Sequence, residues 1–428
     1  MKRLASLLLM LVLIVVAVAS CTTPAEKPPA PTPEPPAEET PAEETPPAEE
    51  PAPAEKTKLK FAVQADSTKA LEEIVKAFNE KSEKYEVEAI IMTNDSGQMH
   101  DQLLNSLSAK SDEYDVISMD VVWAGEFAAA GYLEPVDEFL MENNWLPTDF
   151  NKGSMDSGKY KGKTYVLPYF PDLGFLYVRK DIVSEEDLAK LQSGDYTYAD
   201  LLEMAKKYQG EKETRYGYVY QSKQYEGLVC NLNEFTGNWS KLGEGLETMK
   251  AFMDAGVLPD DILTYDEGST HTAFINGESV FARNWPYMNG MIAAGDQVVK
   301  SDQVDYAPLP DGGTVGGWIL GINTASANKE GALEFLGFIS GPEGQKINAT
   351  VGGYLPGFNK LLEDADVQAS NALLTNPGFK KALEKTIARP VVPNYAEVSD
   401  LIQIATHKLL SGNGQLEETI TQIETLLQ

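Results

Sequence analysis

The chain has 428 residues and a formal net charge of −30, and it contains 3 His and 2 Cys residues. So large an excess of negative charge argues against nucleic acid and anionic membrane surfaces as partners. The length allows a large core divided between two lobes. Cys21 and Cys230 cannot form a disulfide framework, and the histidines show no spacing typical of a zinc or iron site. We therefore expect no metal site and no cofactor.

Residues 1–20 have the pattern of a targeting segment. Lys2 and Arg3 form a positive region before an apolar stretch at residues 7–19, which is too short to indicate a transmembrane span. Residues 18–21 resemble the bacterial lipobox, which implies cleavage before Cys21 and acylation of that cysteine. A plain signal peptide is the alternative. We expect an extracytoplasmic protein, lipid-anchored to the cell membrane through Cys21.

Residues 21–57 are rich in Pro, Glu, Ala and Thr. This composition cannot bury enough apolar surface to fold, and Pro together with repulsion between Glu residues favours an extended chain. At roughly 3.1 Å per residue the segment can reach about 110 Å. We expect a disordered tether that holds a folded body away from the membrane. A disordered spacer without a length requirement is the alternative.

From residue 58 onward, strand patterns and helix patterns alternate. The periodicity predicts strands over residues 59–63, 85–91 and 114–119 and helices over residues 69–81 and 96–108. This order is typical of a parallel sheet in an α/β lobe, where ligands bind beyond the carboxyl ends of the strands. Asp120 ends the third strand, where its carboxylate can bind a diol or cap the next helix.

Two later segments are candidates for crossings between lobes. One is an irregular segment at residues 169–174, between strands predicted at 162–168 and 175–178, and the other is a short strand and turn at 304–310. On the next strand, Gly316 and Gly317 precede Trp318, which indicates either close approach of the backbone to a ligand or a bulge. Further helices are predicted over residues 181–191, 198–208, 243–255, 329–339, 398–410 and 416–427.

Residues 281–287 place a cation, an amide, an indole and a phenol at the end of a short strand. Pro286 ends that strand and leaves Trp285 and Tyr287 beside Arg283 and Asn284. Flat aromatic faces next to hydrogen-bonding groups suit a sugar, which has C–H groups on its faces and hydroxyls on its rim. Taken alone, the segment also fits a place in the core or on the surface.

Several segments together resemble the extracellular solute-binding proteins of ABC importers for sugars, and the trehalose/maltose-binding proteins most closely. They are residues 119–123, 173–181, 223–230, 283–287, 316–318 and 389–390. The resemblance covers the chain from residue 58 to its end. It implies an α/β, two-lobed periplasmic-binding-protein fold with three hinge crossings. The implied N-terminal lobe contains residues 58–168 and 307–338, and the C-terminal lobe contains residues 172–303 and 341–428.

The resemblance also implies a ligand site in the cleft between the lobes. Asp120, Asp172 and Arg389 are expected to bind sugar hydroxyls. Trp285 and Trp318 are expected to stack on sugar rings. The remaining candidates are Gly317, whose backbone approaches the sugar, Phe170, at a position where the family often has Tyr, and also Trp123, His100 and Tyr354. Packing in a lobe is the alternative for Trp123.

The first lobe departs from the family pattern at two places. The loop at residues 65–67 is shorter than in the family, and Met99 or His100 stands where an Arg is expected near the start of the helix at 96–108. A site built to hydrogen-bond a hydroxyl loses much affinity when one partner is missing. The particular sugar is therefore left open by the sequence.

We expect a monomeric lipoprotein that captures a disaccharide or short oligosaccharide by hinge closure, delivers it to an ABC permease and performs no covalent chemistry. One alternative is a secreted glycosidase that uses Asp120 and Asp172 as a carboxylate pair. The other is a two-lobed binding protein for a peptide, a polyamine or iron. Arg283 and Arg389 argue against a cationic ligand if both face the cleft. We interpret Cys230 as a small buried hydrophobe.

Overall fold

The computed structural model describes residues 55–390 and 394–427. The predicted targeting segment, the lipidation site Cys21 and the tether up to residue 54 lie outside the described residues. Strand β1 begins at Thr57, at the predicted end of the tether. The described residues belong to one compact unit. In the part of the chain that the structure describes, no helix is long and apolar enough to cross a membrane.

The larger of two main sheets has 6 strands. In spatial order they are β12 (Thr386–Ile387), β11 (Gly313–Ile322), β3 (Val116–Asp120), β1 (Thr57–Gln64) and β2 (Tyr85–Met92), and β6 (Leu167–Leu173) pairs with β11. Strands β1, β2 and β3 run parallel, whereas β11 runs antiparallel to β3. The carboxyl ends of the three parallel strands therefore meet at one edge, where Asp120 lies.

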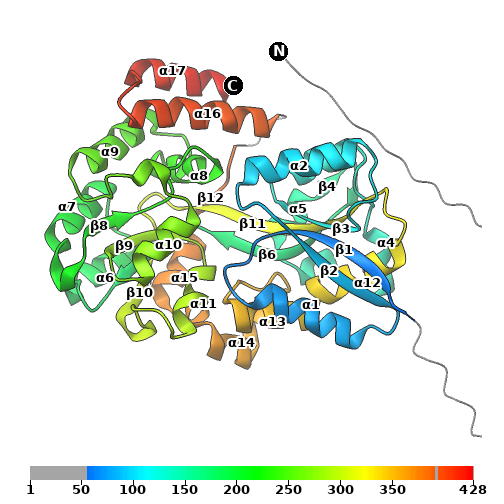
Figure 1. The fold of residues 1–428 in the computed structure, drawn as a ribbon. Helices are drawn as coiled ribbons and strands as arrows, with labels where there is room; N and C mark the ends of the chain where they lie inside the picture. Colours follow the sequence, from blue (N-terminus) through cyan, green and yellow to red (C-terminus); the bar gives the residue numbers. More distant parts are fainter. Residues whose placement is uncertain (1–54, 391–393, 428) are drawn as a thin grey trace, which may run out of the picture. The chain divides into compact units, whose positions relative to one another are not determined.

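Both faces of the larger sheet are covered by helices (Figure 1). One face is covered by α1 (Ala70–Lys81), α12 (Lys329–Ser340) and α13 (Pro342–Gly352). The other helices around this sheet are α2 (Ser96–Ser108), α3 (Ala124–Ala129), α4 (Asp137–Glu142) and α5 (Lys152–Ser157). Alternation along β1 explains the layering, because Phe61 packs in the core shared with α1 and α12, whereas Ala62 packs in the core shared with α2. A two-stranded hairpin, β4 (Lys159–Tyr160) and β5 (Lys163–Thr164), completes this lobe.

The smaller sheet has 4 strands in the order β10, β7, β9 and β8. These are β10 (Val304–Ala307), β7 (Phe175–Arg179), β9 (Ser279–Asn284) and β8 (Tyr216–Val219). The remaining helices are α6 (Glu185–Ser193), α7 (Tyr198–Tyr208), α8 (Glu226–Phe235), α9 (Leu242–Asp254), α10 (Glu267–Ile275), α11 (Tyr287–Ala293), α14 (Ala365–Ser370), α15 (Pro377–Glu384), α16 (Tyr395–Leu410) and α17 (Leu416–Leu426). The two sheets, each with its own helices, form the two lobes expected from the sequence.

Residues 169–173 of the segment predicted as irregular at 169–174 belong to strand β6 instead, so the prediction of an irregular segment was wrong. Strand β6 contains Pro168 and Pro171, and among the described strands it pairs only with β11. A strand with one free edge tolerates Pro, because the missing N–H is not needed for a second ladder. The register between β6 and β11 shifts between Trp318 and Ile319, so the bulge follows Trp318, whereas Gly316 and Gly317 pair in regular register.

Helix α13 packs against α1 and α12, and it also contacts α11 and α14. Gly341 links α12 to α13 directly. The lobe boundaries expected from the sequence, with residues 341–428 in the second lobe, stay a prediction.

Candidate functional site

A cavity of about 380 Å³ is lined by residues from both lobes. Strands β1, β3, β6 and β11 of the larger sheet contribute lining residues, as do the amino-terminal ends of α2, α8, α10 and α11. Seven expected site residues line this cavity together with the further candidate Tyr354: Asp120, Phe170, Asp172, Trp285, Gly317, Trp318 and Arg389. Residues separated by up to 269 positions in the chain are thus brought to one place.

Trp285 forms a fixed aromatic wall of the cavity. It lies between β9 and α11, and only 9% of its surface is exposed. The guanidinium carbon of Arg283 lies 3.9 Å from the centre of the indole, and the indole Nε1–H donates to a carboxylate oxygen of Glu267 at 3.2 Å. The ring is therefore held by a cation–π contact and a hydrogen bond. A Cβ on Gly316 would lie 3.0 Å from the indole, so a larger residue at this position would require the ring to move.

Trp318 and Phe170 supply further aromatic surface. Trp318 is half-buried and meets the buried Trp123 edge-on, with ring centres 5.6 Å apart. Phe170 stacks on Tyr354 with ring centres 4.3 Å apart. The Tyr354 hydroxyl donates to Asp66 Oδ1 at 2.8 Å, so both aromatic pairs are held by partners outside the cavity.

Asp120 and Arg389 are paired with each other. Arg389 Nη1 donates to Asp120 Oδ2 at 2.9 Å, and Nη2 donates to the other carboxylate oxygen, which makes the pair bidentate. Asp120 ends β3 of the first lobe, whereas Arg389 also donates to Glu226 of α8 at 3.0 Å. Glu226 accepts further hydrogen bonds from Tyr395 and Ser399. The two residues expected to bind hydroxyls thus form a buried ion pair between the lobes.

Asp172 differs from Asp120 in having few hydrogen-bond partners within the protein. Its carboxylate accepts from the backbone N–H of Leu173 at 3.0 Å, and among the described residues it has no other hydrogen-bond donor. Burial raises the pKa of the Asp172 carboxyl well above its ordinary value, although Arg283 acts in the opposite direction. A half-buried carboxylate that lines a cavity with unused acceptor sites is suited to hydroxyl donors from a ligand.

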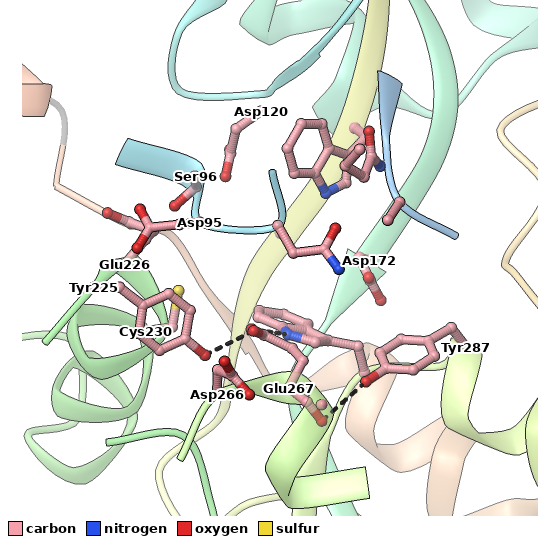
Figure 2. A pocket seen from close by; sticks show the side chains of 18 of the residues that line it. Asp95, Ser96, Asp120, Asp172, Tyr225, Glu226, Cys230, Asp266, Glu267 and Tyr287 are labelled. Atoms are coloured by element: carbon pink, nitrogen blue, oxygen red, sulfur yellow. Dashed lines mark hydrogen bonds between the residues drawn. The ribbon is translucent and has the colours of Figure 1, made fainter. Parts of the chain in front are cut away.

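Glu267 is a site residue that sequence reasoning missed. Its carboxylate accepts from Trp285 Nε1 and from the Tyr225 hydroxyl at 2.7 Å, and its carbonyl oxygen accepts from Tyr287 at 3.4 Å (Figure 2). Burial raises the pKa of the Glu267 carboxyl, and the hydrogen bonds from Tyr225 and Trp285 oppose the rise. An acidic residue next to the N-cap Asp266 looks like an ordinary helix start in the sequence, so only the fold reveals its second role.

Other lining residues come from segments to which the sequence assigns no role. Residues 223–230 stand out by resemblance alone, and the structure places Lys223, Tyr225, Glu226 and Cys230 at the cavity. Cys230 is buried, which agrees with the interpretation as a small hydrophobe, and burial raises the pKa of its thiol. Periodicity could not show these contacts, since the residues lie on a loop and the first turns of α8.

His100 and Trp123 lie beside the cavity rather than in it. Both line an adjoining cavity of about 410 Å³. The His100 ring stacks on Phe127 and its Nε2 lies 3.0 Å from Glu126 Oε2. Burial lowers the pKa of His100, but Glu126 and Asp101 outweigh this effect and the net shift is upward. Met99 is buried in the core as well. Neither Met99 nor His100 therefore takes the place at the cavity of the Arg expected near the start of this helix.

Arg283 does not face the cavity. Its side chain is fully buried, and its guanidinium donates to both carboxylate oxygens of Glu234, at 2.9 and 2.6 Å. Of the two arginines expected to oppose a cationic ligand, only Arg389 lines the cavity, and it is paired with Asp120 and Glu226. In the described part of the chain, no group of three or more His, Cys, Asp or Glu residues is arranged to hold a metal ion.

The sequence of this chain is similar to those of known solute-binding proteins. The family model for "Bacterial extracellular solute-binding protein" matches residues 63–346. A "Probable ABC transporter-binding protein" of Deinococcus radiodurans is 28% identical over 71% of this chain and 77% of its own length. A "Maltotriose-binding protein" of Pyrococcus abyssi is 25% identical over 67% of this chain and 64% of its own length.

A solved structure shares the fold over nearly all the described residues. The structure of "Maltose bound T. maritima MalE3" is 29% identical and superposes with a TM-score of 0.77, over 86% of this chain and 99% of that chain. The two-lobed fold expected from the sequence is thereby confirmed.

Proposed function

This chain belongs to the family of bacterial extracellular solute-binding proteins, and we propose that its solute is a disaccharide or short oligosaccharide of the maltose or trehalose type. One observation carries the proposal: Trp285 and Trp318 line the same cavity as Asp172, a carboxylate with unused acceptor sites. Indoles suit the C–H faces of sugar rings, and a carboxylate accepts from hydroxyls at their rim. The relatives named as binding maltotriose and maltose support the same class of ligand.

In this proposal the ligand acts by favouring a closed arrangement of the lobes. Contacts from both lobes to one sugar stabilise the closed form over the open one. The ion pair between Asp120 and Arg389 contributes to closure in addition to the ligand. The closed, loaded protein, a monomer, then delivers its sugar to an ABC permease, and the relative named as an ABC transporter-binding protein supports this partner.

The extracytoplasmic location follows from the family, and we propose a lipid anchor on Cys21. The support is the lipobox-like pattern of residues 18–21 after a short apolar stretch. Cys21→Ala is expected to move the protein from the membrane fraction to the soluble fraction of cells, measured by immunoblot. An unchanged distribution, or an N-terminal peptide without acyl mass in wild type, contradicts the anchor.

We propose that the protein binds its sugar without cleaving it. Of the carboxylates expected to form a catalytic pair, Asp120 is held by Arg389, so it does not stand free beside Asp172 to protonate or attack a glycosidic bond. Incubation with maltotriose and trehalose is expected to release no glucose, measured by an enzyme-coupled glucose assay. Steady release that disappears in Asp172→Asn contradicts the proposal.

A cationic solute such as a polyamine is the second candidate. The cavity is lined by Asp95, Asp120, Asp172, Glu226, Asp266 and Glu267, but by only two cationic side chains, Lys223 and Arg389. A screen by thermal unfolding tests both candidates, since a ligand that binds only the native state raises the melting temperature. We expect shifts with maltose, maltotriose or trehalose and none with spermidine, and the reverse result contradicts the sugar assignment.

A further inference from the structure

Most charged side chains that line the cavity already have partners inside the protein. Arg389 is held by Asp120 and Glu226, and Glu226 also accepts from Tyr395 and Ser399. Glu267 accepts from Trp285 and Tyr225. Such groups are satisfied before any ligand enters, so a ligand gains little from them unless it displaces a partner. The groups with unused capacity are therefore those that distinguish one ligand from another.

The ammonium of Lys223 has unused capacity of this kind. Its Nζ lies 3.9 Å from Asp95 Oδ2 and 3.7 Å from Asp266 Oδ2. Both distances allow electrostatic attraction but exceed the range of an N–H···O hydrogen bond. Within the described part of the chain, no acceptor receives a hydrogen bond from this ammonium, and 40% of the side chain is exposed. Its three donors are thus available at the cavity.

The position of Lys223 is fixed by elements of both lobes. Its backbone N–H donates to the carbonyl oxygen of Tyr265 at 2.9 Å, which anchors the loop before α8. Asp95 caps α2 of the first lobe, with Oδ1 accepting from the Gln98 N–H at 3.1 Å. Asp266 caps α10 of the second lobe in the same way through the Ser269 N–H at 3.1 Å. One oxygen of each carboxylate is held by its helix, and the other, Oδ2, faces Lys223 (Figure 2 shows both carboxylates).

The first lobe supplies no cation of its own to this cavity. Among the described first-lobe residues that line it are Gln64, Thr93, Asn94, Asp95, Ser96 and Gln98, and none is Lys or Arg. A hydroxyl both donates and accepts, so neighbouring hydroxyls can accept from an ammonium while they donate to the carboxylates at its sides. Hydrogen bonds to a charged group are stronger than those between neutral groups.

We propose that Lys223 binds the ligand directly and determines specificity, by donating to hydroxyls of the sugar at the point where the two lobes meet. The inference rests on the proposed function of sugar capture. Asp95 and Asp266 accept from the same or adjacent hydroxyls. A sugar that lacks those hydroxyls leaves the ammonium and carboxylates without partners in the closed cleft, and it is rejected for that reason.

The test is calorimetric titration of the full chain with maltose, maltotriose and trehalose. Lys223→Met keeps the aliphatic stem and removes the charge, and it is expected to raise the Kd of the sugar that wild type binds by at least tenfold at an unchanged melting temperature. Lys223→Arg is expected to restore part of the affinity. Lys180→Met is the matched control, because Lys180 is exposed on the second lobe and does not line the cavity.

A second set of variants distinguishes two roles of Lys223, direct binding of the ligand and simple neutralisation of Asp95 and Asp266. In Asp95→Asn with Asp266→Asn both helix caps remain, since Asn caps as well as Asp. If Lys223 donates to the ligand, Lys223→Met weakens binding in this background too. If wild type binds a sugar and Lys223→Met binds equally well, or if the two Asn substitutions abolish its effect, the inference is overturned. Absence of binding by wild type to every sugar instead overturns the proposed function, and this inference with it.

Discussion

At the scale of single residues, side chains that line the cavity are held in place by contacts with other protein groups. Trp285 is the clearest case, with Arg283 at the ring and Glu267 on the indole N–H. Arg283 is in turn held by Glu234. Side chains fixed in this way lose little conformational freedom when a ligand binds, which favours affinity.

Replacing this wall tests its contribution to binding. Trp285→Ala is expected to weaken sugar binding by about tenfold or more, equivalent to about 1.4 kcal/mol, because the ring contributes apolar contact and stacking. The measurement is the Kd from calorimetric titration. Trp239→Ala is the control, since Trp239 is half-buried in the second lobe away from the cavity. Equal effects of both substitutions on the Kd contradict the role assigned to Trp285.

The pair of His100 and Glu126 predicts a pH dependence of stability. Because the pKa of His100 is raised in the folded state, the pair stabilises the protein fully below the unfolded pKa of about 6.5, and this contribution is lost as pH rises through the folded pKa. Glu126→Gln is therefore expected to lower the free energy of unfolding at pH 5.5 by up to about 1 kcal/mol, and by less at pH 8.5. Urea unfolding at both values measures it.

The control for that prediction is Glu247→Gln. Glu247 is exposed on α9 and makes no ion pair among the described residues, so its effect is expected to be small at both pH values. A deficit of Glu126→Gln that stays constant or grows with pH is incompatible with a raised pKa for His100.

At the scale of elements, β11 is the strand that joins the site to the fold. It pairs with β3, β6 and β12 and carries Gly316, Gly317 and Trp318 past the cavity. Gly317 has φ of 126°, and a Cβ there would lie 2.9 Å from the carbonyl oxygen of Phe170. Both the left-handed conformation and the close approach of β6 require glycine.

Gly317→Ala is expected to lower the free energy of unfolding by roughly 1–3 kcal/mol or more, since strain and a steric clash add. Gly162→Ala is the matched control, because Gly162 has φ of 79° but no atom within 4 Å of the position that a Cβ would take. Urea unfolding of both variants separates conformational strain from close approach. Similar losses in the two variants would show that the contact with Phe170 has no effect.

How well the elements follow from the sequence depends on how local their causes are. Helix α2 begins and ends where its pattern predicts, at Ser96 and Ser108, because Asp95 caps it and the apolar spacing continues throughout. The course of strand β6 through residues 169–173 was not predicted, because its prolines are tolerated only through pairing on one edge with a strand about 150 residues later. Local patterns therefore predict helices with caps, whereas strands made by distant pairing need the fold.

The same distinction applies to the site. Phe170, Trp285, Trp318 and Asp172 were singled out in the sequence and lie at the cavity, and their roles stay predictions. The pairing of Asp120 with Arg389 could not be predicted, because it joins residues 269 positions apart. Lys223 and Glu267 were missed for the same reason, since their partners come from other elements.

At the scale of the whole molecule, the lobes are joined by a continuous core and by ion pairs. One apolar cluster runs from Phe61 and Phe335 in the first lobe to Tyr177 and Phe274 in the second. On the cavity side, Asp120 and Arg389 connect the lobes through charge. Removing one partner of a buried ion pair leaves the other charge without compensation, which is costly.

Arg389→Gln is therefore expected to shift the sugar-free protein toward an open arrangement. The radius of gyration from small-angle X-ray scattering is expected to increase relative to wild type without sugar, and Asp120→Asn should act in the same direction. Lys180→Met, on the surface of the second lobe, should leave the radius unchanged. A radius identical to wild type in both cleft variants contradicts a role of this pair in closure.

A sugar bound between the lobes would lie against Trp285 and Trp318. Calorimetric titration of the full chain with maltose, maltotriose and trehalose, in wild type and in the variant carrying both Trp285→Ala and Trp318→Ala, tests this binding site most directly. We expect a Kd near micromolar or below for at least one sugar, about −8 kcal/mol, and a Kd at least a hundredfold higher in the double variant. Absence of binding heat with every sugar, or equal affinity in the two proteins, would contradict sugar binding at these tryptophans.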